Sequence, residues 1–410
     1  MILEQGGKPT LLVLASTYPR WLGDHEPGFV HELARRLTGH FEVIVLCPHA
    51  PGARRAEILD EVRVHRYRYA PQFLETLVND GGIVTNLRRQ PWKWLLVPGF
   101  ILMQGFMAWR LCRREGVDVI HAHWLIPQGF LAALLGCLPG RRLPFVVTSH
   151  GADLYALKGA FLQRLKRWVL SRASAATVVS NAMRDAAAAM GADAGKITVL
   201  PMGVDMQERF VPDETFPRSR SELLFVGRLV EKKGLTYLLD ALPLILRARP
   251  DVTLTIAGFG PDEDRLKAKV ASLGIQREVR FLGAVTQSEL PRLYQRAALF
   301  VAPFVKAASG DQEGLPVALM EAVACGCPVV VGDIPGIEDL LGELKPEICV
   351  DVRRSEALAA KILFMLSENV VAARLAERVS ASASKVVDWE RVSTAYARLL
   401  AQDSDSPGTR

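Results

Sequence analysis

The feature that most constrains the fold is an alternation of apolar strands and amphipathic helices, which runs through the chain twice. Short β-branched runs typical of buried strands are each followed by a turn-rich loop and a segment with helical spacing. The first series extends from Thr10 to Leu200, and the second from Glu222 to Val350. Strands joined by helices pair in parallel, because each helix returns the chain to the same end of the sheet. The sequence therefore predicts an α/β protein with two doubly wound, Rossmann-like domains.

The length of 410 residues agrees with more than one domain. We place an N-terminal domain at residues 1–207 and a C-terminal domain at residues 208–386. The polar segment 207–221 contains two prolines and is the best candidate for the linker between them. An amphipathic pattern predicts a last helix within residues 387–402, and a disordered tail follows at residues 403–410.

The composition indicates a globular protein of a reducing compartment. Half of the residues are hydrophobic, which excludes a disordered chain. The net charge of +6 favours anionic partners such as nucleotide phosphates or anionic lipid, and we expect no nucleic-acid partner. The six cysteines form no C-x-x-C pair, which fits a reducing cytoplasm. The N-terminus shows no basic stretch followed by an apolar one, so we expect no signal peptide.

Residues 92–111 differ from the rest of this globular composition, because they form a long apolar segment. No charged residue lies between Trp94 and Trp109, and basic residues flank the segment at Arg88, Arg89, Lys93, Arg110, Arg113 and Arg114. The length and the aromatic ends approach those of a membrane span, but four residues weaken that interpretation: Pro98, Gly99, Gln104 and Gly105. Two alternatives are equally supported: a helix that lies in the interface of an anionic membrane, and a buried helix of the domain.

Residues 309–332 combine a loop with acidic residues, a helix and a strand. Glu313 precedes the predicted helix Val317–Cys325, and Glu321 interrupts this otherwise apolar helix eight positions later. Pro316 suits the first turn of a helix, where its missing N–H costs nothing. A carboxylate within a buried helix costs free energy unless a partner satisfies it. The simpler explanation of this pair is that Glu313 lies at the surface and Glu321 is partly exposed. That explanation does not account for a carboxylate within an apolar helix.

Two loops that follow strands of the second series suit a phosphate ligand. Arg228 and Lys233 lie between a strand end and a helix start, where a diphosphate would receive charge-assisted hydrogen bonds. A solvated basic loop is the alternative for this pair. Gly258 belongs to a Gly-x-Gly turn after the next strand, and a tight strand-to-helix turn explains it at least as well as contact with a nucleotide.

Histidines follow two strands of the first series. His150 and Asp153 come after the strand Pro144–Thr148 and beside a glycine, where a ligand can approach the backbone. His121 and His123 lie two positions apart on one strand, and such a pair could belong to a metal site. No third or fourth ligand is evident in the sequence, so we expect no metal.

These segments together resemble the family-4 retaining glycosyltransferases, which have the GT-B fold. The most specific part is E-G-L-P-x4-E with its continuation A-x-G-x-P-V-V-V, and the R-x4-K, T-x-H-G-x-D and H-A-H-W stretches add to it. The resemblance implies two Rossmann-like domains that face each other across a cleft, with the last helix packing back on the N-terminal domain. It also implies transfer of a sugar from a nucleotide-sugar with retained configuration, without a metal or another cofactor.

The resemblance implies a role for each candidate residue near the reacting centre. Arg228 and Lys233 hold the donor diphosphate and stabilise the leaving nucleoside diphosphate by their positive charge. Glu313 faces the hydroxyls of the donor sugar, and His150 contacts this sugar or the transition state. No nucleophile of the enzyme is evident, so the reaction would depend on positioning and cations, with the leaving phosphate oxygen acting on the acceptor hydroxyl.

Other candidates are expected to bind the substrates. Glu321 accepts hydrogen bonds from the ribose hydroxyls, and Asp153 orients His150 or binds the acceptor. The remaining substrate-binding candidates of the donor and acceptor sides are Gly314, Leu315, Gly258, Val285 and His123.

The sequence departs from the family pattern at three places. In the loop Thr17–Gly28, which members use to close over the diphosphate, Gly23 and Gly28 are separated rather than adjacent. Met202 replaces an asparagine at the domain junction, and Pro335 replaces a glycine after a late strand. The last two changes lie outside the diphosphate and carboxylate positions.

We therefore expect a hexosyltransferase that uses a UDP-sugar and a saccharide or lipid-linked acceptor in exopolysaccharide or lipid-linked polysaccharide biosynthesis. Its expected location is the cytoplasm, in peripheral contact with the anionic inner face of the cell membrane. The alternatives are a nucleotide-sugar epimerase of the same fold and a non-catalytic scaffold of a polysaccharide assembly complex. A glycosidase pair of Glu313 and Glu321 is disfavoured by the buried helix position and the basic loop. A dehydrogenase is disfavoured because neither first βα turn carries G-x-G-x-x-G.

Overall fold

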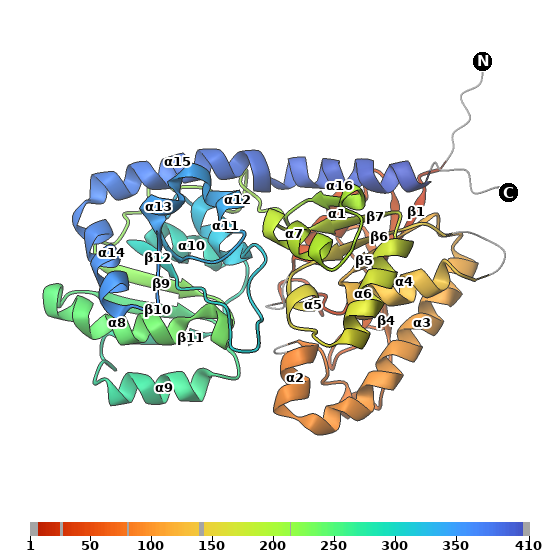
Figure 1. Cartoon of the computed structure of the whole chain (residues 1–410), viewed down its shortest axis with the longest axis horizontal. Coiled ribbons are helices and arrows are strands. Elements are labelled where there is room, and N and C mark those ends of the chain that lie inside the picture. Colours follow the sequence, from red (N-terminus) through yellow and green to blue (C-terminus); the bar gives the residue numbers. More distant parts are fainter. Residues whose placement is uncertain (1–6, 25–27, 80–81, 139–142, 214, 405–410) are drawn as a thin grey trace, which may run out of the picture. The chain divides into compact units, whose positions relative to one another are not determined.

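The computed structural model describes residues 7–24, 28–79, 82–138, 143–213 and 215–404 of the chain. These residues form two compact units (Figure 1). Unit 1 contains most of the first half of the chain together with the residues from Ser393 onward, and unit 2 contains Ser180–Ala182 and Pro201–Val392. Each unit is built around its own parallel sheet.

Unit 1 follows the predicted alternation of strands and helices, and its first strand and helix begin where the sequence pattern begins. Its elements are β1 (Thr10–Leu14), α1 (Phe29–Leu37), β2 (Glu42–Pro48), β3 (Ala56–Leu59), β4 (Val62–Tyr67), η1 (Gln72–Leu74), α2 (Ile83–Arg89), η2 (Pro91–Leu96), α3 (Val97–Arg114), β5 (Val119–His123), η3 (Leu125–Gly129), α4 (Phe130–Leu135), β6 (Phe145–Ser149), α5 (Ala152–Tyr155), α6 (Ala160–Arg172), β7 (Ala175–Val178), α7 (Asn181–Ala189), η4 (Ala194–Lys196) and β8 (Ile197–Val199).

The described strands of unit 1 form one sheet in the order β3-β4-β2-β1-β5-β6-β7-β8. All neighbours are parallel except β3 and β4, which form an antiparallel hairpin that the sequence analysis missed. The central strand β1 is fully buried at Leu11, Leu12 and Leu14, as expected for a strand covered on both faces. The order of the strands reverses at β1, and in a doubly wound sheet a ligand binds at the carboxyl ends of the strands at such a point.

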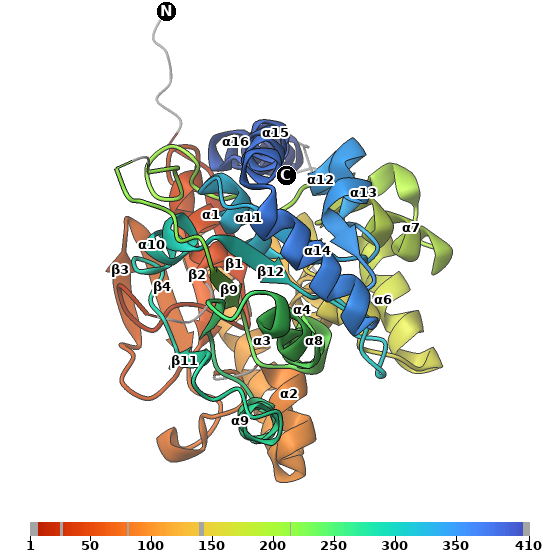
Figure 2. The same ribbon diagram turned by 90° about the vertical axis from the view of Figure 1, so that its left-hand side faces the viewer.

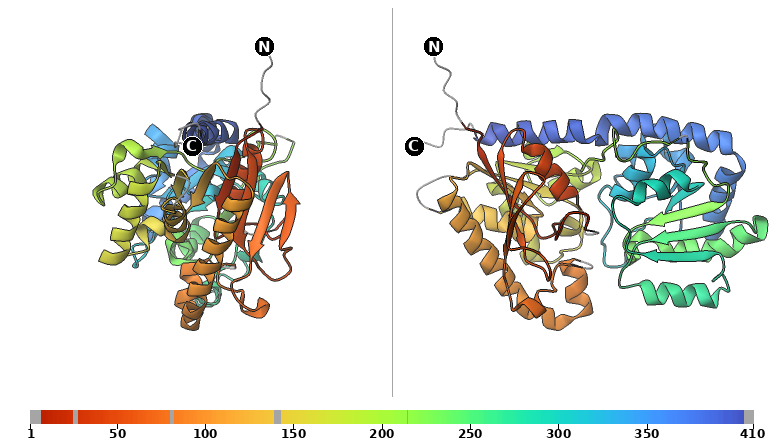
Figure 3. Two further views of the ribbon diagram at one scale, coloured as in Figure 1. Left: turned by 90° about the vertical axis from the view of Figure 1, so that its right-hand side faces the viewer. Right: turned by 180° about the vertical axis from the view of Figure 1, so that it is seen from behind.

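The segment 92–111, predicted as one helix, lies within two elements, η2 and the α-helix α3. The buried residues of α3 recur every three or four positions at Phe100, Gln104, Ala108 and Leu111. The helix itself, orange in Figure 3, lies beside strands β2 and β4 of the unit 1 sheet. In the described part of the chain, Pro91–Arg114 is one helical stretch whose length and composition would allow it to cross a membrane. Only 28% of its most apolar window is buried.

Unit 2 repeats the architecture, and its first strand β9 begins at Glu222, where the second series of the sequence begins. Its elements are β9 (Glu222–Val226), η5 (Glu231–Lys233), α8 (Leu235–Ala248), β10 (Thr253–Ala257), α9 (Glu263–Ser272), β11 (Val279–Gly283), α10 (Leu290–Arg296), β12 (Leu299–Ala302), α11 (Val317–Ala324), β13 (Val329–Gly332), α12 (Glu338–Leu341), η6 (Gly342–Leu344), α13 (Lys345–Ile348), β14 (Cys349–Val350), α14 (Ser355–Ser367), α15 (Asn369–Val387) and the start of α16 (Trp389–Ser404).

The described strands of unit 2 form a parallel sheet in the order β11-β10-β9-β12-β13-β14. Helices cover both faces: α8, α9 and α14 form one group, and α10, α11, α12 and α15 form another (Figures 1 and 2). The sheet order reverses between β9 and β12. The loops that follow these two strands are therefore the expected place for a ligand of this unit.

The segment 207–221, predicted as a linker, is bound to unit 2 rather than free. Phe210 is buried, and Arg218 Nη1 donates hydrogen bonds to the carbonyl oxygens of Tyr294 and Ala297 at 2.9 and 2.7 Å. Its polar side chains satisfy carbonyl groups at helix and strand ends, where the backbone has no partner of its own. Other polar residues of the segment, such as Gln207, Glu208 and Arg220, are exposed, so its polar composition reflects both internal contacts and exposure to water.

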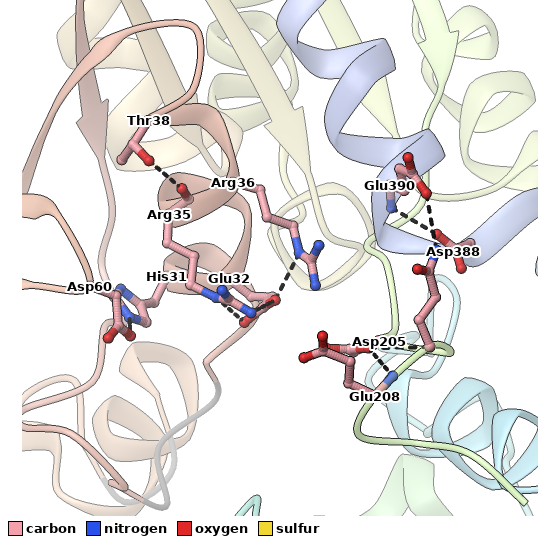
Figure 4. A network of polar contacts seen from close by, with 11 residues as sticks. His31, Glu32, Arg35, Arg36, Thr38, Asp60, Asp205, Glu208, Asp388 and Glu390 are labelled. Carbon is pink, nitrogen blue, oxygen red and sulfur yellow. Dashed lines mark hydrogen bonds and ion pairs between the residues drawn. The ribbon is translucent and has the colours of Figure 1, made fainter.

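The last helix begins beside the domain junction, where Met202 departs from the family pattern. Gly203 faces the ring of Trp389, and a Cβ at Gly203 would lie 2.6 Å from its Cε3 atom. Figure 4 shows Asp205 and Asp388 of this region, and Asp388 accepts a hydrogen bond from the backbone N–H of Glu390 at 2.8 Å. Such a bond satisfies a free N–H in the first turn of a helix.

Helix α16 extends to Ser404, past the end that the sequence predicted. Its residues from Ser393 belong to unit 1, where Tyr396 and Leu400 are fully buried. Residues 405–410, the rest of the predicted disordered tail, lie outside the described residues.

We predict that Gly203→Ala lowers the thermal stability of the protein, because the added methyl group must displace the Trp389 ring. Overpacking of this kind costs about 1–3 kcal/mol, which corresponds to a fall of roughly 3–8 °C in melting temperature. Gly39→Ala is the matched control, since a Cβ at Gly39 meets nothing within 4 Å. Calorimetry of both variants tests the prediction, and equal melting temperatures would contradict it.

Candidate functional site

The loops after β9 and β12 bring four charged side chains of unit 2 together. Lys233 Nζ lies 3.1 Å from Glu313 Oε2, and Lys232 Nζ lies 3.3 Å from Glu313 Oε1. Lys232 also donates a hydrogen bond to Asp311 Oδ1 at 3.3 Å. We call Lys232, Lys233, Asp311 and Glu313 the charge cluster. It lies where the sheet order reverses, and it explains Asp311, to which the sequence analysis assigned no role.

Burial and charge oppose each other in this cluster. Burial alone would raise the pKa of Glu313, but the ammonium groups of Lys232 and Lys233 lower it to about 2. Burial lowers the pKa of Lys233 despite Glu313, whereas Glu313 and Asp311 together outweigh burial and raise the pKa of Lys232. Glu313 is therefore ionised at neutral pH.

Glu313 keeps hydrogen-bonding capacity for a ligand. Among the described residues, no group donates a hydrogen bond with good geometry to its Oε1 atom, although Lys232 lies within ion-pair distance. A buried carboxylate oxygen without a donor is rare in folded proteins and calls for an explanation. A ligand hydroxyl group would supply the missing donor.

Close packing of backbones holds these loops in place. Gly234 has φ +69°, and a Cβ there would overlap the carbonyl oxygen of Pro303 in the loop after β12. Gly258 has φ +146°, and its Cβ would overlap the carbonyl oxygen of Gly227. Both positions thus require glycine. A tight turn accounts for Gly258, which packs against the loop that carries Arg228, and contact of Gly258 with a nucleotide stays a prediction.

The loops that follow the strands of unit 2 contain the other predicted donor-side residues, namely Arg228, Gly314, Leu315 and Val285. Arg228 follows β9 and is half-buried. Burial lowers the pKa of Lys233 most, and the positive charges of Lys232 and then Arg228 lower it further. Leu315 is buried in the loop before α11, and Val285 lies beyond the end of β11. The carbonyl oxygen of Gly314 would lie 3.1 Å from a Cβ at Gly336, so these two loops also pack closely.

Glu321 lies buried on α11, as the sequence predicted, and its environment is opposite to that of Glu313. Burial raises the pKa of Glu321 to about 7, although a hydrogen bond from the Tyr294 hydroxyl, at 3.0 Å, acts in the other direction. Tyr294 comes from α10 and is itself fully buried. The sequence analysis missed it, because a tyrosine on an amphipathic helix resembles any other core residue.

Three histidines of unit 1 form a buried group at the ends of β5 and β6. The rings of His123 and His150 are nearly parallel, and His123 Nδ1 lies 3.0 Å from His150 Nε2 in a hydrogen bond. His121 Nε2 bonds the Thr148 hydroxyl at 2.7 Å. Burial lowers the pKa of His121 and of His150 to about 3, and it lowers that of His123 well below its usual range. All three rings are therefore neutral at physiological pH.

Asp153 fixes the loops around this group. Its carboxylate accepts hydrogen bonds from the Leu125 N–H at 2.8 Å, the Ser149 hydroxyl at 2.9 Å and the His150 N–H at 3.2 Å. Burial raises its pKa, and these three donors act in the opposite direction. The carboxylate thus holds the backbone of His150.

A chain of hydroxyl groups connects the histidines to the last helix, and no signal in the sequence indicated it. The Thr148 and Thr177 hydroxyls lie 2.6 Å apart, and the Tyr396 hydroxyl lies 3.2 Å from that of Thr177. The Tyr396 hydroxyl also bonds the carbonyl oxygen of Leu200 at 3.2 Å. These residues are far apart in sequence, and only the fold of unit 1 brings them together.

The glycine loop Thr17–Gly28 lies after β1, where the sheet order of unit 1 reverses. Gly23 has φ +79°, and Asp24 accepts hydrogen bonds from both the backbone and the guanidinium of Arg20. Residues 25–27 of the predicted loop lie outside the described residues. The contact of this loop with a donor stays a prediction.

Comparisons with known proteins agree with this architecture. Residues 206–385 match the family model "Glycosyl transferases group 1", and residues 29–208 match "Glycosyltransferase Family 4". Together the two matches span both units, and the chain belongs to this family of glycosyltransferases. The amylovoran biosynthesis glycosyltransferase AmsK of Erwinia amylovora is 37% identical over 186 residues, which are 44% of this chain and 44% of AmsK. The match thus spans less than half the length of that relative.

Solved structures confirm the GT-B fold. Sucrose-phosphate synthase from Thermosynechococcus elongatus superimposes with a TM-score of 0.77 at 18% identity, over 96% of this chain and 99% of that one. The Anabaena protein HepE, solved in complex with UDP and glucose, superimposes with a TM-score of 0.70 at 18% identity, over 96% of this chain and all of HepE.

The pKa of Glu321 predicts a pH dependence of stability. Its value of about 7 exceeds the ordinary 4.5, so its protonated form stabilises the fold below about pH 4.5. This contribution is lost as the pH rises to about 7. Glu321→Gln cannot ionise at this position. We therefore expect its free energy of unfolding, relative to that of the parent protein, to rise by about 2 kcal/mol from about pH 5 to about pH 8.

Glu313→Gln is the control for this measurement. The pKa of Glu313 is about 2, so its contribution is complete at both pH values and is lost only as the pH falls toward 2. Urea unfolding of the parent and both variants at the two pH values gives the comparison. A parallel pH response of Glu321→Gln and the parent would show that Glu321 is ionised in the folded protein.

Proposed function

We propose that this chain transfers a hexose from a nucleotide-sugar, a UDP-sugar in particular, to a saccharide or lipid-linked saccharide. The observation that carries the proposal is the buried charge cluster at the point where the sheet order of unit 2 reverses. A cluster with two lysines beside Arg228 suits a diphosphate, and its carboxylates suit sugar hydroxyls. The family membership supports the same reaction class.

In this proposal Arg228 and Lys233 bind the donor diphosphate. Cleavage of the bond between sugar and phosphate builds negative charge on the leaving oxygen, and fixed cations lower the barrier by stabilising that charge. Lys233 is held in place by Glu313 and by the Phe304 ring, whose centroid lies 5.0 Å from its Nζ atom. No metal is needed for this step, because the protein itself supplies the positive charge.

The two glutamates recognise different parts of the donor. Glu313 is ionised and has an oxygen without a hydrogen-bond donor among the described residues, so it accepts bonds from hydroxyls of the transferred sugar. Glu321, beside Tyr294, binds the ribose hydroxyls. His150 of unit 1 contacts the donor sugar as a neutral hydrogen-bonding group, with His123 and Asp153 fixing its position.

The proposed setting is the biosynthesis of a cell-surface polysaccharide in the cytoplasm, at the inner face of the membrane. AmsK is named for amylovoran biosynthesis, which supports a polysaccharide product. HepE was solved with UDP and glucose, which supports a UDP-sugar as the donor.

The proposal predicts that Lys233→Ala lowers kcat/KM for sugar transfer by about 10²–10³-fold, because one cation on the leaving group is lost. UDP should also raise the melting temperature of the parent but not of this variant. Lys267→Ala is the matched control, since Lys267 forms an exposed ion pair with Glu263 at 2.7 Å on α9. Screening UDP, GDP and their sugars in the same assay identifies the base.

Unchanged transfer by Lys233→Ala would overturn the assignment of the charge cluster. Stabilisation of the parent by GDP and not by UDP would overturn the choice of donor alone. Free nucleotide with an epimerised sugar, formed without any acceptor, would favour the epimerase alternative.

The proposal also predicts retained configuration and no dependence on a divalent metal. NMR of the product formed from a donor of known anomeric configuration should show the same configuration in the new glycosidic bond. Addition of EDTA should leave the initial rate unchanged, because protein cations stabilise the leaving group. An inverted product, or a rate abolished by EDTA and restored by Mg²⁺, would contradict these parts of the proposal.

A further inference from the structure

One face of the stretch formed by η2 and α3 is fastened to unit 1 by specific contacts. Gln104 is fully buried, and its side-chain amide donates to the carbonyl oxygen of Ala15 at 3.3 Å and accepts from Gln128 at 3.2 Å. A Cβ at Gly99 would lie 2.6 Å from the carbonyl oxygen of Tyr69, so helix and loop backbones touch. Gly99 and Gln104, two of the four residues that weaken a membrane span, therefore attach the helix to the domain.

The opposite face of the same stretch is apolar and exposed. Its residues recur with helical spacing, and four of them are at least half exposed: Trp94 (60%), Leu95 (81%), Leu102 (69%) and Phe106 (50%). Trp92 and Trp109 lie at its two ends and are also exposed. We call these six residues the apolar surface. A row of large apolar side chains that the fold leaves in water indicates an interaction site.

Positive charge surrounds the apolar surface. The sequence from Ile83 to Arg114 contains six basic residues and no acidic residue. Five of the six are exposed, namely Arg88, Arg89, Arg110, Arg113 and Arg114. Lys93 is the exception, because it is buried and donates to the carbonyl oxygen of Thr76 at 2.8 Å. Arg113 also lies over the Trp109 ring, 5.4 Å from its centroid.

We propose that the apolar surface inserts into the interface of an anionic membrane, with the surrounding arginines on lipid headgroups. Tryptophans at both ends suit the depth of the headgroups, and aliphatic side chains between them suit the start of the acyl chains. The helix lies in the plane of the membrane and does not cross it, since crossing would break the contacts of Gln104 and Gly99.

Charge distinguishes this partner from a second copy of the chain. In a two-fold dimer the same surface meets itself, so the arginines of both copies would approach each other without acidic partners. An anionic lipid surface attracts them instead, at about 1 kcal/mol for each arginine near the headgroups. The inference does not rest on the donor site, because unit 1 alone carries the surface.

Flotation of the full-length protein with lipid vesicles tests the proposal. We expect binding to phosphatidylcholine vesicles that contain about one third phosphatidylglycerol, and much weaker binding to phosphatidylcholine alone. Leu95→Ser with Leu102→Ser should lower the partition coefficient at least about tenfold, since both side chains lose their apolar contact. Ile58→Ser is the matched control, because Ile58 is 71% exposed on β3 and lies outside the surface.

The charge is tested separately. Arg110→Gln with Arg113→Gln should lower binding to anionic vesicles about fivefold for each arginine, and added salt should weaken the binding of the parent. Arg374→Gln, at an exposed position on α15, is the control. Stabilisation by UDP should be unchanged in every variant, which separates a failure here from a failure of the proposed function.

Equal binding to neutral and anionic vesicles would overturn the role of the arginines. Absence of vesicle binding, together with a dimer that Leu95→Ser and Leu102→Ser dissociate in sedimentation experiments, would assign the surface to a second copy of the chain. Loss of binding in Ile58→Ser as well would show that the effect is not specific to the apolar surface.

Discussion

The candidate site of unit 2 depends on the contact of one backbone with another at the carboxyl ends of parallel strands. Gly234 presses on the Pro303 carbonyl, Gly258 on that of Gly227, and Gly332 on that of Phe304, with no room for a Cβ at any of them. The contact of Gly234 with Pro303 sets the distance between the loop after β9 and the loop after β12, and the other two contacts join neighbouring loops to these. That distance brings Lys232 and Lys233 within 3.3 Å of Glu313. Glycines that contact no ligand would thus determine how closely the charges approach.

Two glutamates on one short segment show how local surroundings decide the chemistry of a side chain. Glu313 and Glu321 are both buried, and burial acts in the same direction on both. Two ammonium groups reverse its effect at Glu313, whereas Glu321 has a neutral hydroxyl as its nearest partner. The spacing of two carboxylates could suggest an acid and a base, but the nearby cations make recognition of a bound donor the better explanation for Glu313. A raised pKa at Glu321 allows it to exchange a proton when a ligand binds.

Much of the fold could be predicted from the sequence, because the spacing of apolar residues indicates which side chains of a strand or helix are buried. The alternation of strands and helices in both units agrees with the pattern, and so does the burial of Glu321 on α11. What could not be predicted are contacts between residues distant in sequence. Tyr294 beside Glu321, and Tyr396 beside Thr177, look like ordinary core tyrosines until the helices are packed. The segment 207–221 was misjudged for a related reason, since Arg218 binds carbonyl groups that only the folded unit 2 presents.

The histidine group limits how unit 1 can take part in the proposed reaction. A general acid or base works best with a pKa near the operating pH, and burial places that of His150 at about 3. A neutral imidazole still donates one hydrogen bond and accepts another, and the His123 contact uses one of these at His150 Nε2. His150 therefore fits the positioning of a sugar hydroxyl better than the transfer of its proton. Such a role agrees with a reaction in which fixed cations stabilise the leaving diphosphate, and in which the diphosphate itself receives the proton of the acceptor.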